Sequence, residues 1–356
     1  MNDEGGTKVL RRGVLLIVLI AALSQCVTSS ASAAAGMRSI TGCAGRPGFQ
    51  TDADHRLYLV YTQSRDTNLI YIDLDKRQSS VLFTLPGLDA DITIGCNEIC
   101  FRRIEWQPPF VTHLGPHRYY ACSIDDSELL QRRELTALWD SSQPNHTRCA
   151  FVSDRLLCLV SPSEGAGAPQ PFVSTLYVME NDNSQRFLGS WQNCVFMIYD
   201  SAVMLIHRDD EDYGFYHVFD PVNEKEYLIP RETNDYNFPQ LLLINDMIYV
   251  ATNRRVFSYN VNDGTTSEII QCDQTGLPNL TCIGTDLYIF ADSDHVLYRY
   301  NMRKGTITRQ YETPENLPTH HYSIVVDDML IIGPRQNQLY VYDFVNNAST
   351  QIYIGE

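Results

Sequence analysis

LLLINDMIYV (residues 241–250), followed by VFSYN (256–260), is a pattern that this chain repeats. An apolar segment leads through a short polar turn into a second apolar segment, and an aromatic segment ending in Asn or Asp comes next. The same order returns in CIGTDLYIF (282–290) with LYRYN (297–301), and in IVVDDMLII (324–332) with LYVYD (339–343). A last apolar segment such as QIYI (351–354) closes the unit, so each unit predicts four short antiparallel strands.

Two polar positions recur once in every unit, so the number of times they recur gives the number of units. One lies in the turn between the first two segments, and the other ends the third segment. Asn, Asp and Ser suit such turns because their side chains bond the local backbone, and Asn and Asp tolerate the left-handed conformation. The first set is His55, Asn97, Asp154, Ser201, Asp246, Asp286 and Asp328, and the second is Asp73, Asp125, Glu180, Asp220, Asn260, Asn301 and Asp343. Both sets indicate seven units.

Four strands that recur every 40 to 57 residues or so resemble the β-propeller superfamily, over residues 48 to 356. We therefore expect an all-β fold in which 49–356 forms one seven-bladed β-propeller domain. The second unit is the weakest copy because 127–139 also fits a short helix, and the fallback is six blades with an irregular insert. The chain lacks the WD40 series, the kelch glycine pairs and the sialidase box, so the resemblance implies no active site.

The N-terminus has the order of a secretory signal peptide. Lys8, Arg11 and Arg12 precede an apolar run over 14–23, and small residues follow up to Ala35. The run is short of the ~20 residues that cross a bilayer as a helix. We therefore expect a signal peptide over 1–35, an N-terminal lead over 36–48, and a secreted mature chain without a stable membrane span. A signal-anchored protein, lumenal or at the cell surface, is the alternative.

Three sequons fit this secretory route. Their asparagines, Asn145, Asn279 and Asn347, all fall in predicted turns or loops, where a glycan needs to be.

Cysteine usage points to disulfides in an oxidising compartment. Cys272 and Cys282 bracket one inter-blade loop and are the first predicted pair. Cys100 and Cys122 lie on neighbouring strands of the second unit and are the second. Because Cys26 is lost with the signal peptide, an odd number of cysteines remains, so at least one thiol stays unpaired or bonds another molecule.

Composition limits the class of partner. Hydrophobic residues make up 44% and charged residues 20% of the chain, which excludes a wholly disordered chain and a multi-pass membrane protein. The net charge of −16 disfavours nucleic acid and favours a basic or neutral partner over an acidic one.

Long connections between the second and third strands of units two to four predict a binding rim. They cover about 105–118, 161–171 and 208–213, and they combine aromatic with charged side chains, as interface anchors do. The alternative is that these connections are insertions without a binding role, whose aromatic side chains pack against the nearby surface. The acidic run at 209–212 lacks the spacing of a calcium loop, so no metal site is predicted. The candidate binding residues are Trp106, Phe110, His113, His117, Arg118, Arg208, Asp209, Asp210 and Tyr213.

The predicted function is a secreted, glycosylated module that binds an extracellular protein or glycan. The alternative is a hydrolase or lyase with a metal or a carboxylate and histidine set at the central channel. A matrix or coat module cross-linked through the odd cysteine is a third hypothesis. Candidate channel residues are Asp89, Asp91, Gln192, Asn193, Gln240, His320 and His321. No catalytic motif is present, so an enzyme is the less favoured class and no catalytic residue or cofactor is predicted.

Overall fold

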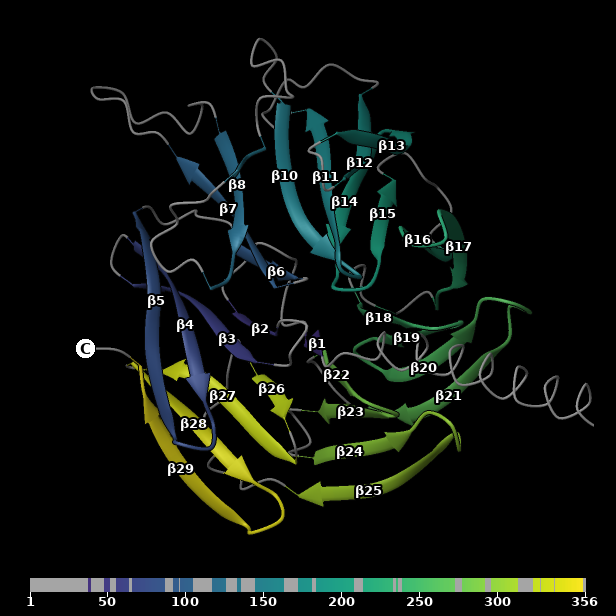
Figure 1. Cartoon of the computed structure of the whole chain (residues 1–356). Coiled ribbons are helices and arrows are strands. Elements are labelled where there is room, and N and C mark those ends of the chain that lie inside the picture. Colours follow the sequence, from purple (N-terminus) through teal and green to yellow (C-terminus); the bar gives the residue numbers. More distant parts are fainter. Residues whose placement is uncertain are drawn as a thin grey trace, which may run out of the picture. The chain divides into compact units, whose positions relative to one another are not determined.

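The computed structural model shows a seven-bladed β-propeller, as the repeats predict (Figure 1). Met37–Glu356 forms one compact unit. All elements in the described part of the chain are β-strands, and no helix there is long and apolar enough to cross a membrane. The structure describes residues 38–39, 48–51, 56–63, 66–86, 92–95, 97–104, 117–125, 133–135, 145–162, 172–180, 184–207, 214–232, 235, 239–272, 277–291, 296–312, 323–326, 328–335 and 337–354. The predicted signal peptide lies outside these ranges.

Each blade is a four-stranded antiparallel sheet whose strands follow chain order. Blade 1 contains β2 (Gly48–Thr51), β3 (Leu57–Gln63), β4 (Asp66–Asp73) and β5 (Gln78–Pro86). Blade 2 contains β6 (Ile92–Gly95), β7 (Glu98–Ile104), β8 (His117–Ser123) and β9 (Arg133–Glu134). Blade 3 contains β10 (Asn145–Val152), β11 (Arg155–Pro162), β12 (Val173–Met179) and β13 (Gln185–Gln192). Blade 4 contains β14 (Cys194–Ile198), β15 (Val203–His207), β16 (Phe215–Asp220) and β17 (Lys225–Pro230).

The last three blades are the most regular. Blade 5 contains β18 (Gln240–Ile244), β19 (Met247–Ala251), β20 (Arg255–Asn260) and β21 (Thr266–Gln271). Blade 6 contains β22 (Asn279–Ile283), β23 (Asp286–Ala291), β24 (Val296–Asn301) and β25 (Thr306–Glu312). Blade 7 contains β26 (Ser323–Val326), β27 (Met329–Arg335), β28 (Gln338–Asp343) and β29 (Ala348–Tyr353).

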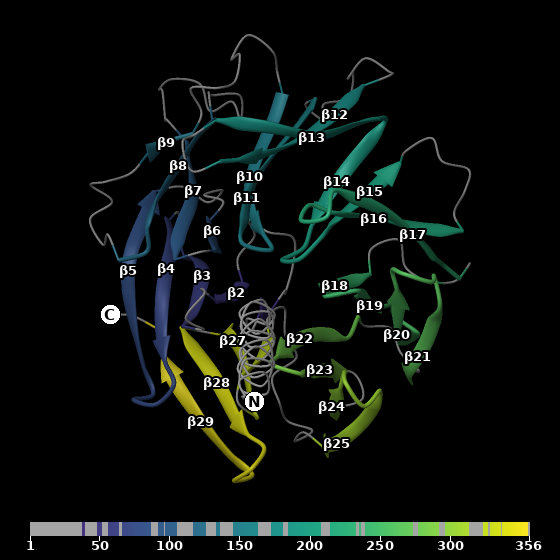
Figure 2. The ribbon, with the colours of Figure 1, turned by 45° about the vertical axis from the view of Figure 1, so that its right-hand side comes forward.

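The first strand of each blade is the innermost, and these strands surround the centre of the ring (Figure 2). We call the side with the connections between second and third strands, and between blades, the loop side. The opposite side carries the connections between first and second strands and between third and fourth strands, and we call it the turn side.

Several polar anchors of the repeat lie in the first hairpin turns as predicted, whereas Asp286 opens β23 and His55 lies outside the described residues. Asn97, Asp154 and Asp328 adopt positive φ angles of 58°, 63° and 61° in the first hairpins of their blades. At the end of the third strand, Asp220 Oδ1 accepts hydrogen bonds from the Val222 and Asn223 amides at 2.8 and 3.2 Å. These side-chain bonds close the turn on the local backbone, which explains the recurring Asp and Asn.

Blade 2 keeps four strands although its repeat is the weakest. Its outermost strand, β9, has only two residues and pairs with Tyr120 and Ala121 of β8. The six-bladed fallback is therefore wrong.

The ring closes between blades 1 and 7 by side-chain packing rather than by strand exchange. Phe49 and Leu59 of blade 1 pack with Ile324 and Leu339 of blade 7 in one buried apolar cluster. A short strand from the N-terminal lead, β1 (Arg38–Ser39), pairs with β22 of blade 6 and makes that sheet five-stranded.

Candidate functional site

The three long connections of the predicted rim leave the loop side of consecutive blades. Residues 105–116 connect β7 to β8, 163–172 connect β11 to β12, and 208–214 connect β15 to β16. Most of the rim residues fall outside the part of the chain that the structure describes. These are Trp106, Phe110, His113, Arg208, Asp209, Asp210 and Tyr213.

His117 and Arg118 were predicted in the loop, but they belong to a strand. They open β8 and pair with Ile104 and Arg103 of β7. The loop is therefore shorter than the sequence indicated, and these two residues stand at its base.

The three sequon asparagines do not share one environment. Asn145 opens β10 opposite Pro162, and Asn279 opens β22, so neither lies in the predicted loop. The Asn279 Nδ2 group donates a hydrogen bond of 2.7 Å to Ser323 Oγ. Asn347 lies in the β28–β29 turn, as predicted, and its Oδ1 accepts a hydrogen bond from the Tyr342 hydroxyl.

The candidate channel residues are scattered. Gln240 opens β18, the innermost strand of blade 5, as predicted. Gln192 instead ends β13, the outermost strand of blade 3, and the following Asn193 accepts a hydrogen bond of 3.0 Å from the Phe172 amide. Asp89, Asp91, His320 and His321 lie outside the described residues.

The predicted Cys100–Cys122 disulfide is wrong. Cys100 lies opposite Ala121 in the β7–β8 ladder and Cys122 lies opposite Ile99, so the two side chains point to opposite faces of the sheet. No disulfide joins Cys272 and Cys282 either: both side chains are buried, and Cys282 Sγ lies 3.8 Å from the Gly284 carbonyl oxygen.

Cys100 instead meets two further thiols between blades 2 and 3, and we call the three the thiol cluster: Cys100, Cys149 and Cys158. Cys149 and Cys158 are directly opposed across the β10–β11 hairpin, with their Sγ atoms 2.9 Å apart. All three side chains are fully buried. Burial, followed by hydrogen bonding with Cys100 and Cys158, raises the pKa of the Cys149 thiol well above its usual value.

A second cluster lies on blade 4, on the face that packs against blade 3. Val203, Leu205 and Phe219 of this face belong to the apolar core shared with blade 3. Because side chains alternate along a strand, the same face presents His207 on β15 and His217 on β16. The row of core side chains therefore ends in two histidines where the interface reaches solvent.

Glu226 of β17 completes this cluster, which we call the histidine site: His207, His217 and Glu226. One nitrogen of each imidazole and one carboxylate oxygen lie within 4.8 Å of one another. His217 Nδ1 is 2.8 Å from Glu226 Oε1, and the two imidazole centroids are 4.8 Å apart. The side chains of His217 and Glu226 are 20% and 35% exposed, so small solutes reach the site.

A side chain of blade 3, Trp191, packs against the histidine site. Trp191 of β13 donates its Nε1 hydrogen to Glu226 Oε2 at 3.3 Å, and its ring packs edge-on against Phe196 and Phe219. Cys194 lies opposite His207 in the β14–β15 ladder and is buried. Burial raises the pKa of the Cys194 thiol to about 12, and the nearby Glu226 charge adds to the shift, so Cys194 stays protonated at neutral pH.

Sequence reasoning missed the histidine site because its members come from three strands. A signal was present, since His207 directly precedes the acidic stretch 208–213 and His217 follows that stretch after three intervening residues, in the next strand. Pairing those two strands around their connection puts both imidazoles on one face.

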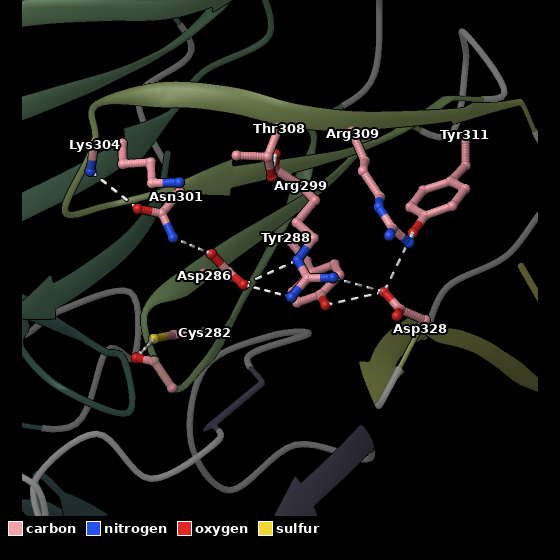
Figure 3. Close-up of polar contacts among 11 residues, drawn as sticks. Cys282, Asp286, Tyr288, Arg299, Asn301, Lys304, Thr308, Arg309, Tyr311 and Asp328 are labelled. Carbon is pink, nitrogen blue, oxygen red and sulfur yellow. Dashed lines mark hydrogen bonds and ion pairs between the residues drawn. The ribbon is translucent and has the colours of Figure 1, made fainter. Parts of the chain in front are cut away.

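A third polar cluster, on the turn side between blades 6 and 7, is structural (Figure 3). Arg299 donates two hydrogen bonds to Asp286 Oδ2, at 2.9 and 2.6 Å, and its Nη1 lies 3.6 Å from Asp328 Oδ1. Tyr288 donates to the same Asp328 oxygen at 3.1 Å. The Asp286 carboxylate beside it raises the pKa of Arg299 further. Because these charges satisfy one another, the cluster ties two blades together.

Comparison with known proteins identifies the fold alone. No family model and no curated protein sequence matches the chain. The structure of apo AztD from Citrobacter koseri is 12% identical, over 86% of each chain, with a TM-score of 0.48. A prolyl endopeptidase structure is 10% identical over 83% of this chain and 46% of that chain, with a TM-score of 0.50. Dihydro-heme d1 dehydrogenase NirN, in complex with DHE, is 10% identical over 88% of this chain and 67% of that chain, with a TM-score of 0.47. At these identities, the similarity concerns the fold and assigns no activity to this chain.

Proposed function

We propose that this protein is a secreted, glycosylated β-propeller that binds an extracellular protein or glycan through the loop side of blades 2 to 4. The supporting observation is the position of the long connections. Blades 1, 5, 6 and 7 join their second and third strands through 64–65, 252–254, 292–295 and 336–337, whereas blades 2 to 4 use 105–116, 163–172 and 208–214. Three neighbouring blades thus add surface on the same side of a rigid ring, where binding loops commonly lie.

Charge indicates the partner's chemistry. The chain has a net charge of −16, and Asp209, Asp210, Glu211 and Asp212 follow one another in the blade 4 connection. Complementary potentials speed association and like charges oppose it. The partner is therefore basic or neutral.

Exchange of connections tests this proposal. One variant replaces residues 105–116 with the short blade 6 connection, 292–295, and a second changes Trp106, Phe110 and Tyr213 to alanine. The matched control replaces the blade 5 connection, 252–254, with the same short segment. Binding is measured against arrays of secreted proteins and glycans, with affinities of hits determined in solution.

We expect the first two variants to lose at least about tenfold in affinity for a hit, because aromatic anchors dominate interfaces. The blade 5 control keeps the wild-type affinity. Equal affinities for wild type and both rim variants would overturn the proposal. Expression in a secreting eukaryotic host tests the rest: a mature N-terminus after Ala35 and glycopeptides at Asn145, Asn279 or Asn347 are expected, and retention of residues 1–35 contradicts secretion by cleavage.

A further inference from the structure

We infer that the histidine site binds a divalent transition-metal ion, with Zn²⁺ as the best match. The geometry is the first argument. Donor atoms around a tetrahedral Zn²⁺ lie about 3.3 Å apart, because each is about 2.0–2.1 Å from the ion. The donors of His207, His217 and Glu226 all lie within 4.8 Å of one another, so rotamer adjustments of a fraction of an ångström to about 1.5 Å bring them to bonding distance.

The types of donor select the class of ion. Two imidazole nitrogens and one carboxylate oxygen form a set that Zn²⁺ and neighbouring transition metals prefer. Ca²⁺ and Mg²⁺ take oxygen ligands almost exclusively, so a site with two histidines discriminates against them.

The surroundings hold the donors in place. The hydrogen bond from Trp191 Nε1 fixes Glu226 Oε2 at 3.3 Å, which leaves Oε1 directed toward His217 Nδ1. Such bonds to the outer oxygen of a ligating carboxylate are typical of metal sites. Phe196 and Phe219 flank the indole ring, so one side of the site is apolar and the other is open to solvent.

Metal binding replaces a proton. Without the ion, a hydrogen bond joins His217 Nδ1 and Glu226 Oε1 at 2.8 Å, and the hydrogen between them occupies the space between two donors. When the ion binds both atoms, that hydrogen is displaced from Nδ1 and the neutral imidazole carries its hydrogen on Nε2, and no bond to carbon forms or breaks.

Three protein donors leave at least one coordination position open. A water molecule fills that position in the free protein, and a histidine or carboxylate of a bound molecule replaces the water. His207 is the last residue of β15, on the loop side, so the open site lies beside the 208–214 connection. The inference stands without the proposed partner, since the ion binds whether or not the connections recognise a protein or glycan.

Titration of the full mature chain with Co²⁺, and then with competing Zn²⁺, tests the inference. The protein is first stripped of metal with a chelator. We expect one equivalent of Co²⁺ to give the visible absorption of a four- or five-coordinate site, and one equivalent of Zn²⁺ to remove it. Millimolar Ca²⁺ or Mg²⁺ leaves the spectrum unchanged.

Variants separate this site from others on the chain. His207→Ala with His217→Ala is expected to weaken binding at least ~100-fold, and Glu226→Gln about tenfold or more. Glu224→Gln, two residues away in the same hairpin, is the matched control that keeps wild-type affinity. Circular dichroism and the melting temperature of each variant show that it is folded.

The emission of Trp191 gives a second measurement in the unchanged site. Zn²⁺ should change the tryptophan fluorescence of the wild-type chain, because Glu226 is shared between the ion and the indole N–H. Trp191→Phe should lose this change and bind about tenfold more weakly. The inference is overturned if the wild-type chain takes up less than one equivalent at millimolar metal, or if the double histidine variant binds as tightly as wild type.

Discussion

The thiol cluster and the histidine site lie against opposite faces of blade 3, and both contain donor groups that bind metals or react. In the thiol cluster, Cys149 and Cys158 lie in the middle of an apolar interface and are fully buried. The histidine site lies at the solvent-exposed end of the row of core side chains on blade 4, and the His217 side chain is 20% exposed. The difference shows that the position of a residue along a row of side chains between two blades, central or at the end, decides whether its polar group is buried or reached by solvent.

Electrostatics follows from the same difference. Desolvation raises the pKa of Cys149, so its thiol is held in the unreactive protonated form. In the histidine site, solvent reaches the donors, and a hydrogen bond from blade 3 orients the carboxylate. Reactive residue types therefore stabilise packing at one interface and are accessible to solvent at the other.

The largest difference in the free energy of unfolding is expected when one residue of each cluster is changed to aspartate. Cys149→Asp places a carboxylate in a fully buried apolar interface, and we expect it to lower the free energy of unfolding by at least ~3 kcal/mol. His207→Asp places the carboxylate beside His217 at a solvent-accessible edge and should cost less than about 1 kcal/mol. Urea unfolding measures both values, and equal losses would contradict the comparison.

Thiol labelling should show the next largest effect. At pH 8, we expect Cys100, Cys149 and Cys158 to react with iodoacetamide at least about 100-fold more slowly in the native chain than in urea, because reagent access requires opening of the interface. Mass spectrometry of labelled peptides gives the rate for each cysteine. Rapid native labelling of Cys149 would show that the interface is open to solvent.

Alkaline pH should weaken the fold by a smaller amount. Burial raises the pKa of Cys194 and of Cys282 to about 12, above the ordinary thiol value of 9.0. Because the folded-state pKa is raised, the contribution to stability is complete below pH 9 and is lost as the pH rises from 9 to 12. Each thiol should remove about 1.4 kcal/mol per pH unit from the free energy of unfolding in that range.

A matched variant isolates one thiol. Cys194→Ala should remove the contribution of one titrating proton from the slope of the free energy of unfolding against pH, whatever the substitution itself costs at pH 7. Urea unfolding at pH 8 to 10.5 provides the slopes. An unchanged slope would mean that Cys194 does not titrate differently in the two states.

The smallest effect is expected for Glu226→Gln in the absence of metal. The Glu226 side chain is 35% exposed, and its pairing with His217 lies at the surface. The free energy of unfolding should therefore change by no more than about 0.5 kcal/mol. A loss above 2 kcal/mol would show that this pair holds the blade together, and would weaken its assignment as a binding site.

Most of the fold was predictable because it depends on local rules. Asp154 lies in a hairpin turn, and Asp220 and Asp343 end third strands, where the repeat put them, since a short turn between strands needs a residue that bonds the local backbone. Tertiary context altered the boundaries of strands and loops, as at His117, where the loop of blade 2 ends two residues earlier than expected.

The sites were harder to predict because they need the register between strands. The hairpin around Ser153 and Asp154 fixes Cys149 opposite Cys158, so that pair was accessible from the turn position alone. Cys100 and Cys122 lie on neighbouring strands, but adjacency does not tell which face each occupies. Predicting the histidine site would have required the registers of two strand pairs, β15–β16 and β16–β17, and the packing of Trp191 from another blade. The spacing of residues in the sequence gives none of these.

The short strand β1 gives the ring a mechanical property. It pairs with β22 of blade 6, and the chain then enters blade 1 at β2, so one continuous backbone connects the two neighbours of blade 7. Among the described residues, the seam between blades 1 and 7 is made of side-chain packing and hydrogen bonds such as that from Ser79 Oγ to the Tyr353 carbonyl, at 2.6 Å. A pulling force on the N-terminus would therefore load the two residue pairs of β1 first, so that this strand detaches from blade 6 before blade 1 bears the force.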